Sequence, residues 1–136
     1  MIAFFDASAL IYVIEAREPF ASTLRQALTA LAELHPGMPV ALSRLTWLEC
    51  RISPLKGGDA VTLARYDTFF ARPDLIWVEL GRDVVELATA VRARHGLRTP
   101  DALQAACCLQ LGPEHLLLTG DTAFTRVSGL RVRVLA

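Results

Sequence analysis

The sequence predicts an α/β fold in which a central, mostly parallel five-stranded sheet lies between two layers of helices. Three observations lead to this prediction. Short apolar runs alternate with segments of helical periodicity, the first four of these runs are almost continuously apolar, and a length of 136 residues suits one domain. Continuous apolar runs are typical of parallel strands, because helices cover such strands on both faces. We therefore expect a single domain over residues 1–136, built as a three-layer α/β/α sandwich.

Each element is predicted from its own pattern. Apolar runs predict strands at residues 2–5, 39–42, 75–78, 116–118 and 130–135. Apolar residues at helical spacing predict helices at residues 7–16, 20–34, 44–55, 59–71, 83–94 and 99–111. We expect Thr99 to cap the last helix, with Pro100 at its first position. The final strand alternates polar and apolar side chains, which favours an edge position with one side in water.

The composition narrows the class of protein. Hydrophobic residues make up 53% of the chain, which argues against disorder, and the net charge of zero gives no global attraction for nucleic acid. The three cysteines lack metal-ligand spacing, so we interpret them as buried apolar residues of a protein in a reducing compartment. No apolar run is long enough to span a bilayer, and no signal peptide opens the chain. We expect a cytoplasmic protein without a membrane partner.

Three carboxylates are predicted to meet at the carboxyl end of the sheet, with a fourth nearby. Asp6 follows the first strand, Asp121 follows the fourth strand after a short turn, and Asp101 lies in the first turn of a helix. Glu49 lies in the helix at residues 44–55. If the first and fourth strands are neighbours, these acids converge, and carboxylates so close together cannot all stay ionised. Because Mg²⁺ prefers carboxylate oxygens, the set predicts a divalent-metal site that can activate water against a phosphodiester.

Each residue also has a simpler interpretation when it is taken alone. Asp101 occupies a position that the helix dipole favours, Asp121 can cap a short helix at residues 122–126, and Glu49 can face solvent. The hydroxyls of Ser8 and Thr119 can contact a phosphate or a metal-bound water, or can simply cap the helices that follow them. The metal site is therefore predicted from the four acids as a set. The three histidines show no ligand spacing and are interpreted as surface or capping residues.

Several other site classes are excluded by the residues present. The chain has neither a dinucleotide-binding glycine motif nor a phosphate-binding P-loop, and it has no nucleophilic serine elbow. A phosphatase of the haloacid dehalogenase type needs a second aspartate where Ser8 stands. A response-regulator receiver needs a lysine after a late strand, and the only lysine is Lys56.

Four segments together resemble the PIN domain family, and most of all the VapC-type ribonuclease toxins of bacterial toxin–antitoxin pairs. The resemblance covers essentially the whole chain. It is carried by Asp6-Ala7-Ser8, by the segment from Leu42 to Glu49, by Leu97-Arg98-Thr99-Pro100-Asp101-Ala102-Leu103, and by Thr119-Gly120-Asp121-Thr122-Ala123-Phe124. One departure is Gly120, where the family often has Asn. We expect a small effect there, with Asp121 held somewhat less firmly.

The resemblance implies an endoribonuclease that depends on Mg²⁺ or Mn²⁺ and cuts single-stranded regions of RNA. It implies that Asp6 and Asp101 are the main metal ligands and that Glu49 and Asp121 complete the pocket, with Ser8 and Thr119 in support. It also implies a homodimer and a cognate antitoxin that inserts a segment, often with an Arg, into the pocket. The alternative is a catalytically silent PIN-fold binding module. Candidate phosphate contacts are the arginines near the acidic segments: Arg44, Arg51, Arg94, Arg98 and Arg126.

Overall fold

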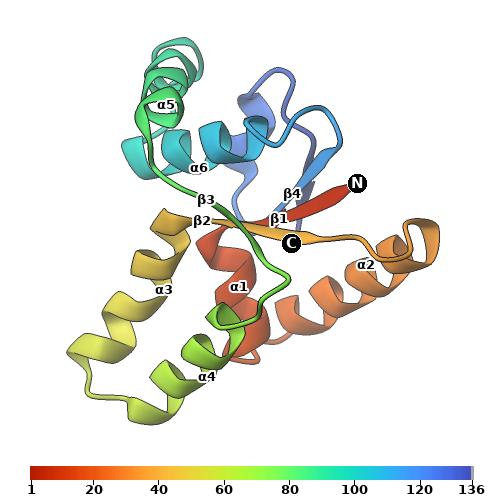
Figure 1. Cartoon of the computed structure of the whole chain (residues 1–136), viewed down its shortest axis with the longest axis vertical. Coiled ribbons are helices and arrows are strands. Elements are labelled where there is room, and N and C mark those ends of the chain that lie inside the picture. The colour runs from red at the N-terminus through yellow and green to blue at the C-terminus, as the bar shows by residue number, and fades with distance from the viewer. Residues whose placement is uncertain (136) are drawn as a thin grey trace.

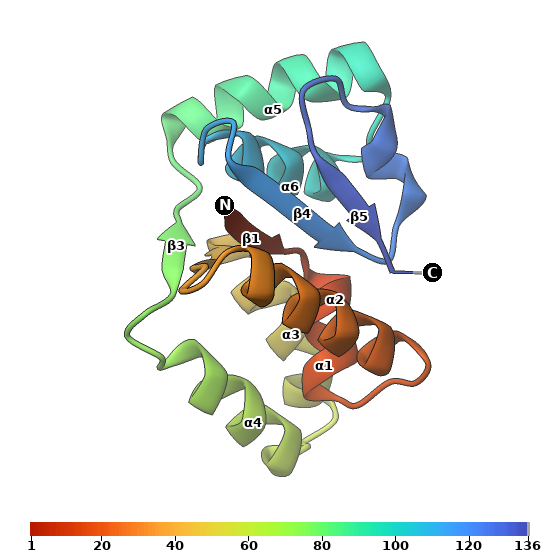
Figure 2. The same ribbon diagram turned by 90° about the vertical axis from the view of Figure 1, so that its right-hand side faces the viewer.

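A computed structural model describes residues 1–135 and shows a five-stranded sheet between two layers of helices (Figures 1 and 2). The strand order is β3-β2-β1-β4-β5, and every pairing is parallel. The strands are β1 (Ile2–Phe5), β2 (Val40–Ser43), β3 (Ile76–Val78), β4 (His115–Thr119) and β5 (Val132–Val134). The helices are α1 (Ala7–Ile14), α2 (Phe20–Leu34), α3 (Arg44–Lys56), α4 (Ala60–Phe70), α5 (Arg82–His95), α6 (Thr99–Leu109) and the 3₁₀ helix η1 (Thr122–Arg126). The predicted α/β/α sandwich is confirmed.

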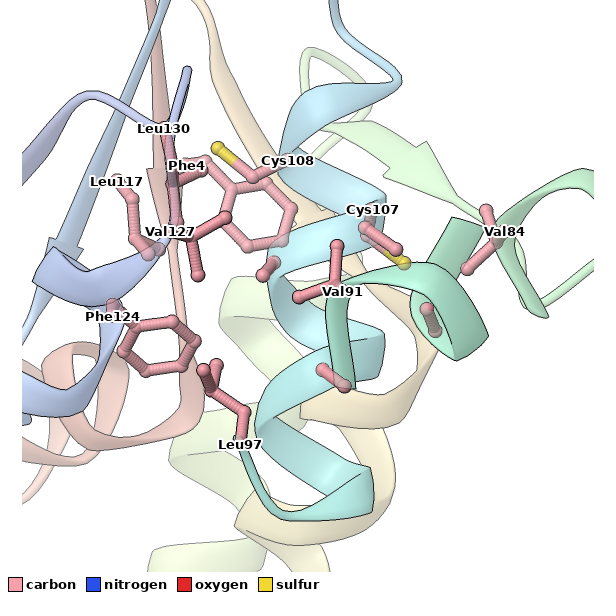
Figure 3. Packing of buried hydrophobic residues seen from close by; sticks show 14 of the residues in the cluster. Phe4, Val84, Val91, Leu97, Cys107, Cys108, Leu117, Phe124, Val127 and Leu130 are labelled. Atoms are coloured by element: carbon pink, nitrogen blue, oxygen red, sulfur yellow. The ribbon is translucent and has the colours of Figure 1, made fainter. Parts of the chain in front are cut away.

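The sheet is buried on both faces because its side chains alternate between two cores. Phe4 of β1 faces the core under α5 and α6, whereas Ala3 and Phe5 face the core formed with α1 to α4. Figure 3 shows the first core, in which Phe4 and Leu117 of the sheet gather with Cys108 and with residues of the segment after η1. This two-sided burial explains why the central strands are continuously apolar in the sequence.

The predicted element boundaries agree best with the structure where a local sequence signal is strong. β1 and α2 have the predicted bounds, and β5 lies at the edge of the sheet as expected. Helix α1 ends at Ile14, earlier than predicted, and Ala16 just beyond it adopts a left-handed φ of 52°. The prediction that Thr99 caps α6 is wrong, since Arg98 is the N-cap and Thr99 is helical. Pro100 fits either register, because the first-turn N–H groups of a helix have no intrahelical partner.

His115 corrects the interpretation of the histidines as surface or capping residues. This residue is only 1% exposed at the start of β4. Nδ1 lies 2.6 Å from the carbonyl oxygen of Gly112, and Nε2 accepts a hydrogen bond of 3.0 Å from the backbone N–H of Arg131. The imidazole therefore ties the loop before β4 to the segment that leads into β5.

The interpretation of the cysteines as buried residues is confirmed. All three cysteines are buried and free. Over residues 1–135, no helix has both the length and the apolar character that crossing a membrane requires.

Candidate active site

Asp6 is the most buried acid of the site, and three donors hold its carboxylate. It caps α1 at the point where β1 ends, with Oδ1 accepting the backbone N–H of Ala9 at 3.0 Å. Ser8 Oγ donates to the same oxygen at 2.7 Å, and Thr119 Oγ1 donates to Oδ2 at 2.5 Å. Asp6 is 6% exposed, and these hydrogen bonds fix its carboxylate in one orientation. A strand that runs directly into a helix thus produces a rigid, buried acid.

The two hydroxyls join the ends of β1 and β4. Ser8 Oγ accepts the backbone N–H of Gly120 at 2.9 Å, and Thr119 Oγ1 accepts that of Asp121 at 3.0 Å. The interpretation of Ser8 and Thr119 as helix caps is therefore wrong: Asp6 caps α1, and Asp121 caps η1 by accepting from the N–H of Ala123 at 2.8 Å. Both hydroxyl protons point to Asp6, so these side chains orient the acid.

Four acids that are far apart in the sequence line one cleft of about 180 Å³. Its lining residues are Asp6, Ala7, Ser8, Glu49, Arg98, Asp101, Gln104 and Asp121. β1 and β4 are paired neighbours, which meets the condition set for convergence and brings Asp6 and Asp121 to the same edge of the sheet. Glu49 comes from α3 and is partly buried, so the interpretation of this residue as solvent-facing is wrong. Asp101 enters from the first turn of α6.

The cleft disfavours negative charge on its own acids. Burial raises the pKa of Asp6, although its hydrogen bonds oppose this, and the charge of Asp101 raises it further. Burial also raises the pKa of Glu49, with added repulsion from Asp6 and Asp101. The pKa of Asp101 is raised by burial and by Asp121, against the attraction of Arg98. Several neighbouring groups that resist ionisation are typical of functional sites, where a bound cation or a substrate changes the balance.

Positive charge at the cleft is limited to its mouth. Among the residues that the structure describes, Arg98 is the one cationic side chain lining the cleft; it is 82% exposed, and its Nε lies 3.6 Å from Asp101 Oδ2. Two other predicted phosphate contacts are engaged elsewhere: Arg44 binds Glu79 through two nitrogens, and Arg51 pairs with Asp67. Arg98 therefore remains the best placed of the predicted arginines.

The donor set suits a hard divalent cation. It consists of carboxylate oxygens and one carboxamide, without sulfur or imidazole. Within residues 1–135, no three His, Cys, Asp or Glu side chains are already close enough together to hold a metal ion. Mg²⁺ needs only one or two carboxylates because it keeps several of its waters. Asp6 and Asp101, with Glu49 and Asp121 around them, fit that requirement.

Gln104 is the site residue that the sequence interpretation missed. It lies one turn after Asp101 on α6, and its Nε2 donates to Glu49 Oε1 at 2.9 Å and to Thr46 Oγ1 at 2.8 Å. The i, i+3 spacing from Asp101 was a usable signal, because residues three apart share one face of a helix. Its partners on α3 are set by tertiary packing and have no local signal.

Gly120 has a spatial reason for lacking a side chain. A Cβ atom there would lie 2.1 Å from Tyr12 Oη and 2.8 Å from Tyr12 Cζ. Tyr12 stacks on Phe20 with ring centroids 4.6 Å apart. The Asn that the family often carries at this position would therefore collide with Tyr12, while Asp121 beside it is held by the hydrogen bonds already described.

Comparisons with known proteins agree with this fold. Residues 3–130 match the PIN domain family. A chain in the crystal structure of VapBC2 from Rickettsia felis, bound to a DNA fragment from their promoter, aligns over 100% of both chains with a TM-score of 0.78 and 16% identity. A chain of a toxin–antitoxin complex from Klebsiella pneumoniae covers 98% of both chains, with a TM-score of 0.70 and 26% identity. A chain of VapBC-1 from nontypeable Haemophilus influenzae aligns with a TM-score of 0.69 and 17% identity. The alignment covers 99% of this chain and 98% of that chain. Among curated proteins, none matches this chain.

The chain is an α/β/α sandwich protein with a parallel sheet and an acidic cleft at the carboxyl ends of its strands. Since the match covers nearly all of its residues, the chain is a member of the PIN domain family. PIN domains are generally nucleases. The predicted family is confirmed.

Proposed function

We propose that this protein is a Mg²⁺-dependent endoribonuclease, with Mn²⁺ as a possible substitute, that hydrolyses phosphodiester bonds in single-stranded regions of RNA as the toxin of a toxin–antitoxin pair. The observation that carries the proposal is the cleft in which Asp6, Glu49, Asp101 and Asp121 surround a small volume with one exposed arginine at its mouth. Such an excess of acid is costly unless a cation binds. Membership of a family that generally consists of nucleases supports the reaction class.

The chain's residues have distinct roles in this proposal. Asp6 and Asp101 are the main ligands, and Glu49 and Asp121 complete the pocket directly or through water. When bound, the cation lowers the pKa of an attacking water and offsets the charge of the phosphodiester. Ser8 and Thr119 keep both oxygens of Asp6 fixed, so that the ligand does not reorganise when the substrate arrives. The exposed guanidinium of Arg98 is placed to contact a phosphate at the mouth.

The proposed partners are a cognate antitoxin and a second copy of the chain. Helix α3 exposes Leu48, Ile52 and Leu55 at the spacing of one helix face, with Trp47 beside them. An apolar face of this kind marks a protein interface. An antitoxin that covers it and inserts an arginine into the acidic cleft would form bidentate hydrogen bonds with the carboxylates and compete with the cation. Light scattering of the purified chain, alone and with the antitoxin, measures both associations.

The test is cleavage of total cellular RNA by the purified protein in Mg²⁺ and in EDTA. We expect discrete fragments in Mg²⁺ and none in EDTA. Asp6→Asn and Asp101→Asn should each lower the rate by more than about 100-fold, since even outer-shell partners of a metal contribute about 10–100-fold. Asp83→Asn is the matched control, because Asp83 lies in the first turn of α5 as Asp101 does in α6, but outside the cleft.

Two results would contradict the proposal. If Asp6→Asn and Asp101→Asn cut RNA as fast as the wild type, the acidic cleft is not the active site and the cleavage comes from a contaminant. If the protein binds Mg²⁺ but cuts no RNA under any condition, the silent binding module is the better description of this chain.

A further inference from the structure

Gln104 connects the acid-bearing helices at the back of the cleft. Its two amide hydrogens are both used, one on Thr46 Oγ1 at 2.8 Å and one on Glu49 Oε1 at 2.9 Å. Thr46 is fully buried, and Gln104 is 2% exposed while still lining the cleft. The carboxamide of Gln104, on the face of α6 that carries Asp101, therefore hydrogen-bonds to the face of α3 that carries Thr46 and Glu49.

The partners of this carboxamide fix its orientation. A carboxylate only accepts hydrogen bonds, so the group that faces Glu49 must be the NH₂ and not the oxygen. Gln104 Oε1 is consequently directed elsewhere, and it is buried without a hydrogen-bond donor among the residues that the structure describes. A buried acceptor without a partner destabilises the folded state. An apolar side chain of similar size would avoid that cost in a helix whose neighbouring residues are buried and apolar.

The surroundings of Gln104 suggest what satisfies this oxygen. Gln104 lines the same cleft as Asp101 and Glu49, and its Nε2 donates to Glu49. An unsatisfied buried group in a folded protein calls for a water, an ion or a functional role. Hard cations take carboxamide oxygens as well as carboxylates, and Mg²⁺ brings bound waters whose hydrogens need acceptors. A water bound to a cation in the cleft would supply the missing donor.

We propose that Gln104 is a positioning residue of the cation site: its amide hydrogens hold Glu49, and its carboxamide oxygen accepts a hydrogen bond from a water of the bound cation. This inference rests on the function proposed above. It adds a fifth residue to the four acids, and it explains why a polar side chain occupies a buried position on α6. Outer-shell partners of this kind orient the ligands and tune the affinity of a metal site.

The first test measures Mg²⁺ and Mn²⁺ binding to the purified protein without RNA, by isothermal titration calorimetry and by electron paramagnetic resonance of Mn²⁺. Gln104→Met keeps the volume but removes both the donors and the acceptor. We expect its cation affinity to fall by about 10–100-fold. Gln110→Met, at an exposed position at the end of the same helix, should bind as the wild type does. An affinity of Gln104→Met within twofold of the wild type would overturn the inference.

A second variant separates positioning from a purely structural link between α3 and α6. Thr46→Val removes the other partner of Gln104 and leaves the contact with Glu49 in place. If Gln104 positions the cation site, Thr46→Val lowers the melting temperature but changes cation affinity much less than Gln104→Met does. If both variants lower stability and neither changes the affinity, Gln104 is a structural link and the inference is wrong.

A third measurement needs no variant and remains decisive if Gln104→Met fails to fold. A crystal structure of the wild type with Mn²⁺, located by anomalous scattering, should place a metal-bound water within hydrogen-bonding distance of Gln104 Oε1. A bound ion whose waters do not contact Oε1 would overturn the inference alone. Wild-type protein that binds neither cation would overturn the proposed function as well, so the two failures are distinguishable.

Discussion

The two ends of strand β4 use the same structural device with opposite consequences. At the amino end, the buried His115 links two segments through the carbonyl of Gly112 and the N–H of Arg131. At the carboxyl end, the buried Thr119 links two segments by donating to Asp6 and accepting from the N–H of Asp121. Each side chain satisfies one donor and one acceptor. Only the bridge at the carboxyl end includes a charged group, the carboxylate of Asp6.

The difference lies in what the bridged groups still require. The partners of His115 are neutral backbone groups, and once they are hydrogen-bonded nothing remains to be satisfied. Thr119 is bonded to a carboxylate whose pKa is raised by burial and by a neighbouring acid. A closed, neutral set of hydrogen bonds contributes to stability, whereas an excess of buried charge reduces stability and is retained where function needs it. Ligands of open α/β sheets also bind at the carboxyl ends of the strands.

The largest effect on stability is expected at the amino end. His115→Ala leaves the Gly112 carbonyl and the Arg131 N–H without partners and opens a cavity. We expect it to lower the free energy of unfolding by about 3 kcal/mol or more, measured by urea denaturation, since each buried unsatisfied group costs about 1–3 kcal/mol. Cation affinity should stay within a few-fold of the wild type.

The control for this prediction is His95→Ala, because His95 ends α5 and is only partly buried. It should cost no more than about 1 kcal/mol, through its interaction with the helix dipole. The contrast between the two ends of β4 would be broken if His115→Ala weakened cation binding as strongly as loss of an acid does.

The next effect is the response of the carboxyl end to pH and to the cation. Because the pKa of Asp101 is raised above its ordinary value of 3.8, the folded protein binds more protons than the unfolded chain just above that pH. Its contribution to stability is complete below 3.8 and is lost as pH rises through the folded-state value. Asp6 and Glu49 act in the same direction. In EDTA, the stability of Asp101→Asn relative to the wild type should therefore increase with pH.

Mg²⁺ should reverse the loss of wild-type stability at neutral pH. Binding to the folded state alone stabilises it by about 2.7 kcal/mol when the cation is at 100 times its Kd. Thermal unfolding between pH 4 and pH 8, with EDTA and with Mg²⁺, measures both effects, and Asp83→Asn controls for loss of an exposed acid. A difference between Asp101→Asn and the wild type that stays constant with pH would show that the cleft does not disfavour charge.

Sequence reasoning predicted the elements best where residues adjacent in the chain determine the structure. Asp6 stops β1 and caps α1 through its own neighbours, so that boundary was predicted to the residue. The end of α1 was missed because it depends on the left-handed φ of Ala16, a residue with no special preference for that conformation. The four acids were predicted to converge because the topology of a parallel sheet brings strand ends together.

The residues that were missed depend on contacts between distant segments. His115 resembles a loop residue beside Pro113 and Glu114, and its hydrogen bond with the segment leading into β5 has no local signal. In the sequence, Gln104 is a polar residue in an apolar helix without an evident partner. Its hydrogen-bond partners come from α3. The sequence gives the types of these residues but not the neighbour that each one meets, and that neighbour determines its role.

The smallest predicted effect concerns Gly120, where the reason for glycine is also a distant contact. Gly120→Ala places a Cβ against the Tyr12 ring, which stacks on Phe20 and yields only in part. We expect a loss of about 1 kcal/mol in the free energy of unfolding, at the lower end of the cost of overpacking, because the obstructing atoms lie at the far end of one side chain.

A double-mutant cycle with Tyr12→Ala tests this explanation. Gly120 is not among the residues with a positive φ, so in the Tyr12→Ala background the added methyl group should be neutral or stabilise by a few tenths of a kcal/mol, through the lower entropy of the unfolded chain. An equal cost in both backgrounds would show that Tyr12 is not the obstacle. If Gly120→Ala also weakened Mg²⁺ binding while His115→Ala did not, the packing of Tyr12 would be part of what places Asp121 at the cleft. The contrast between the two ends of β4 would then extend from hydrogen bonding to packing.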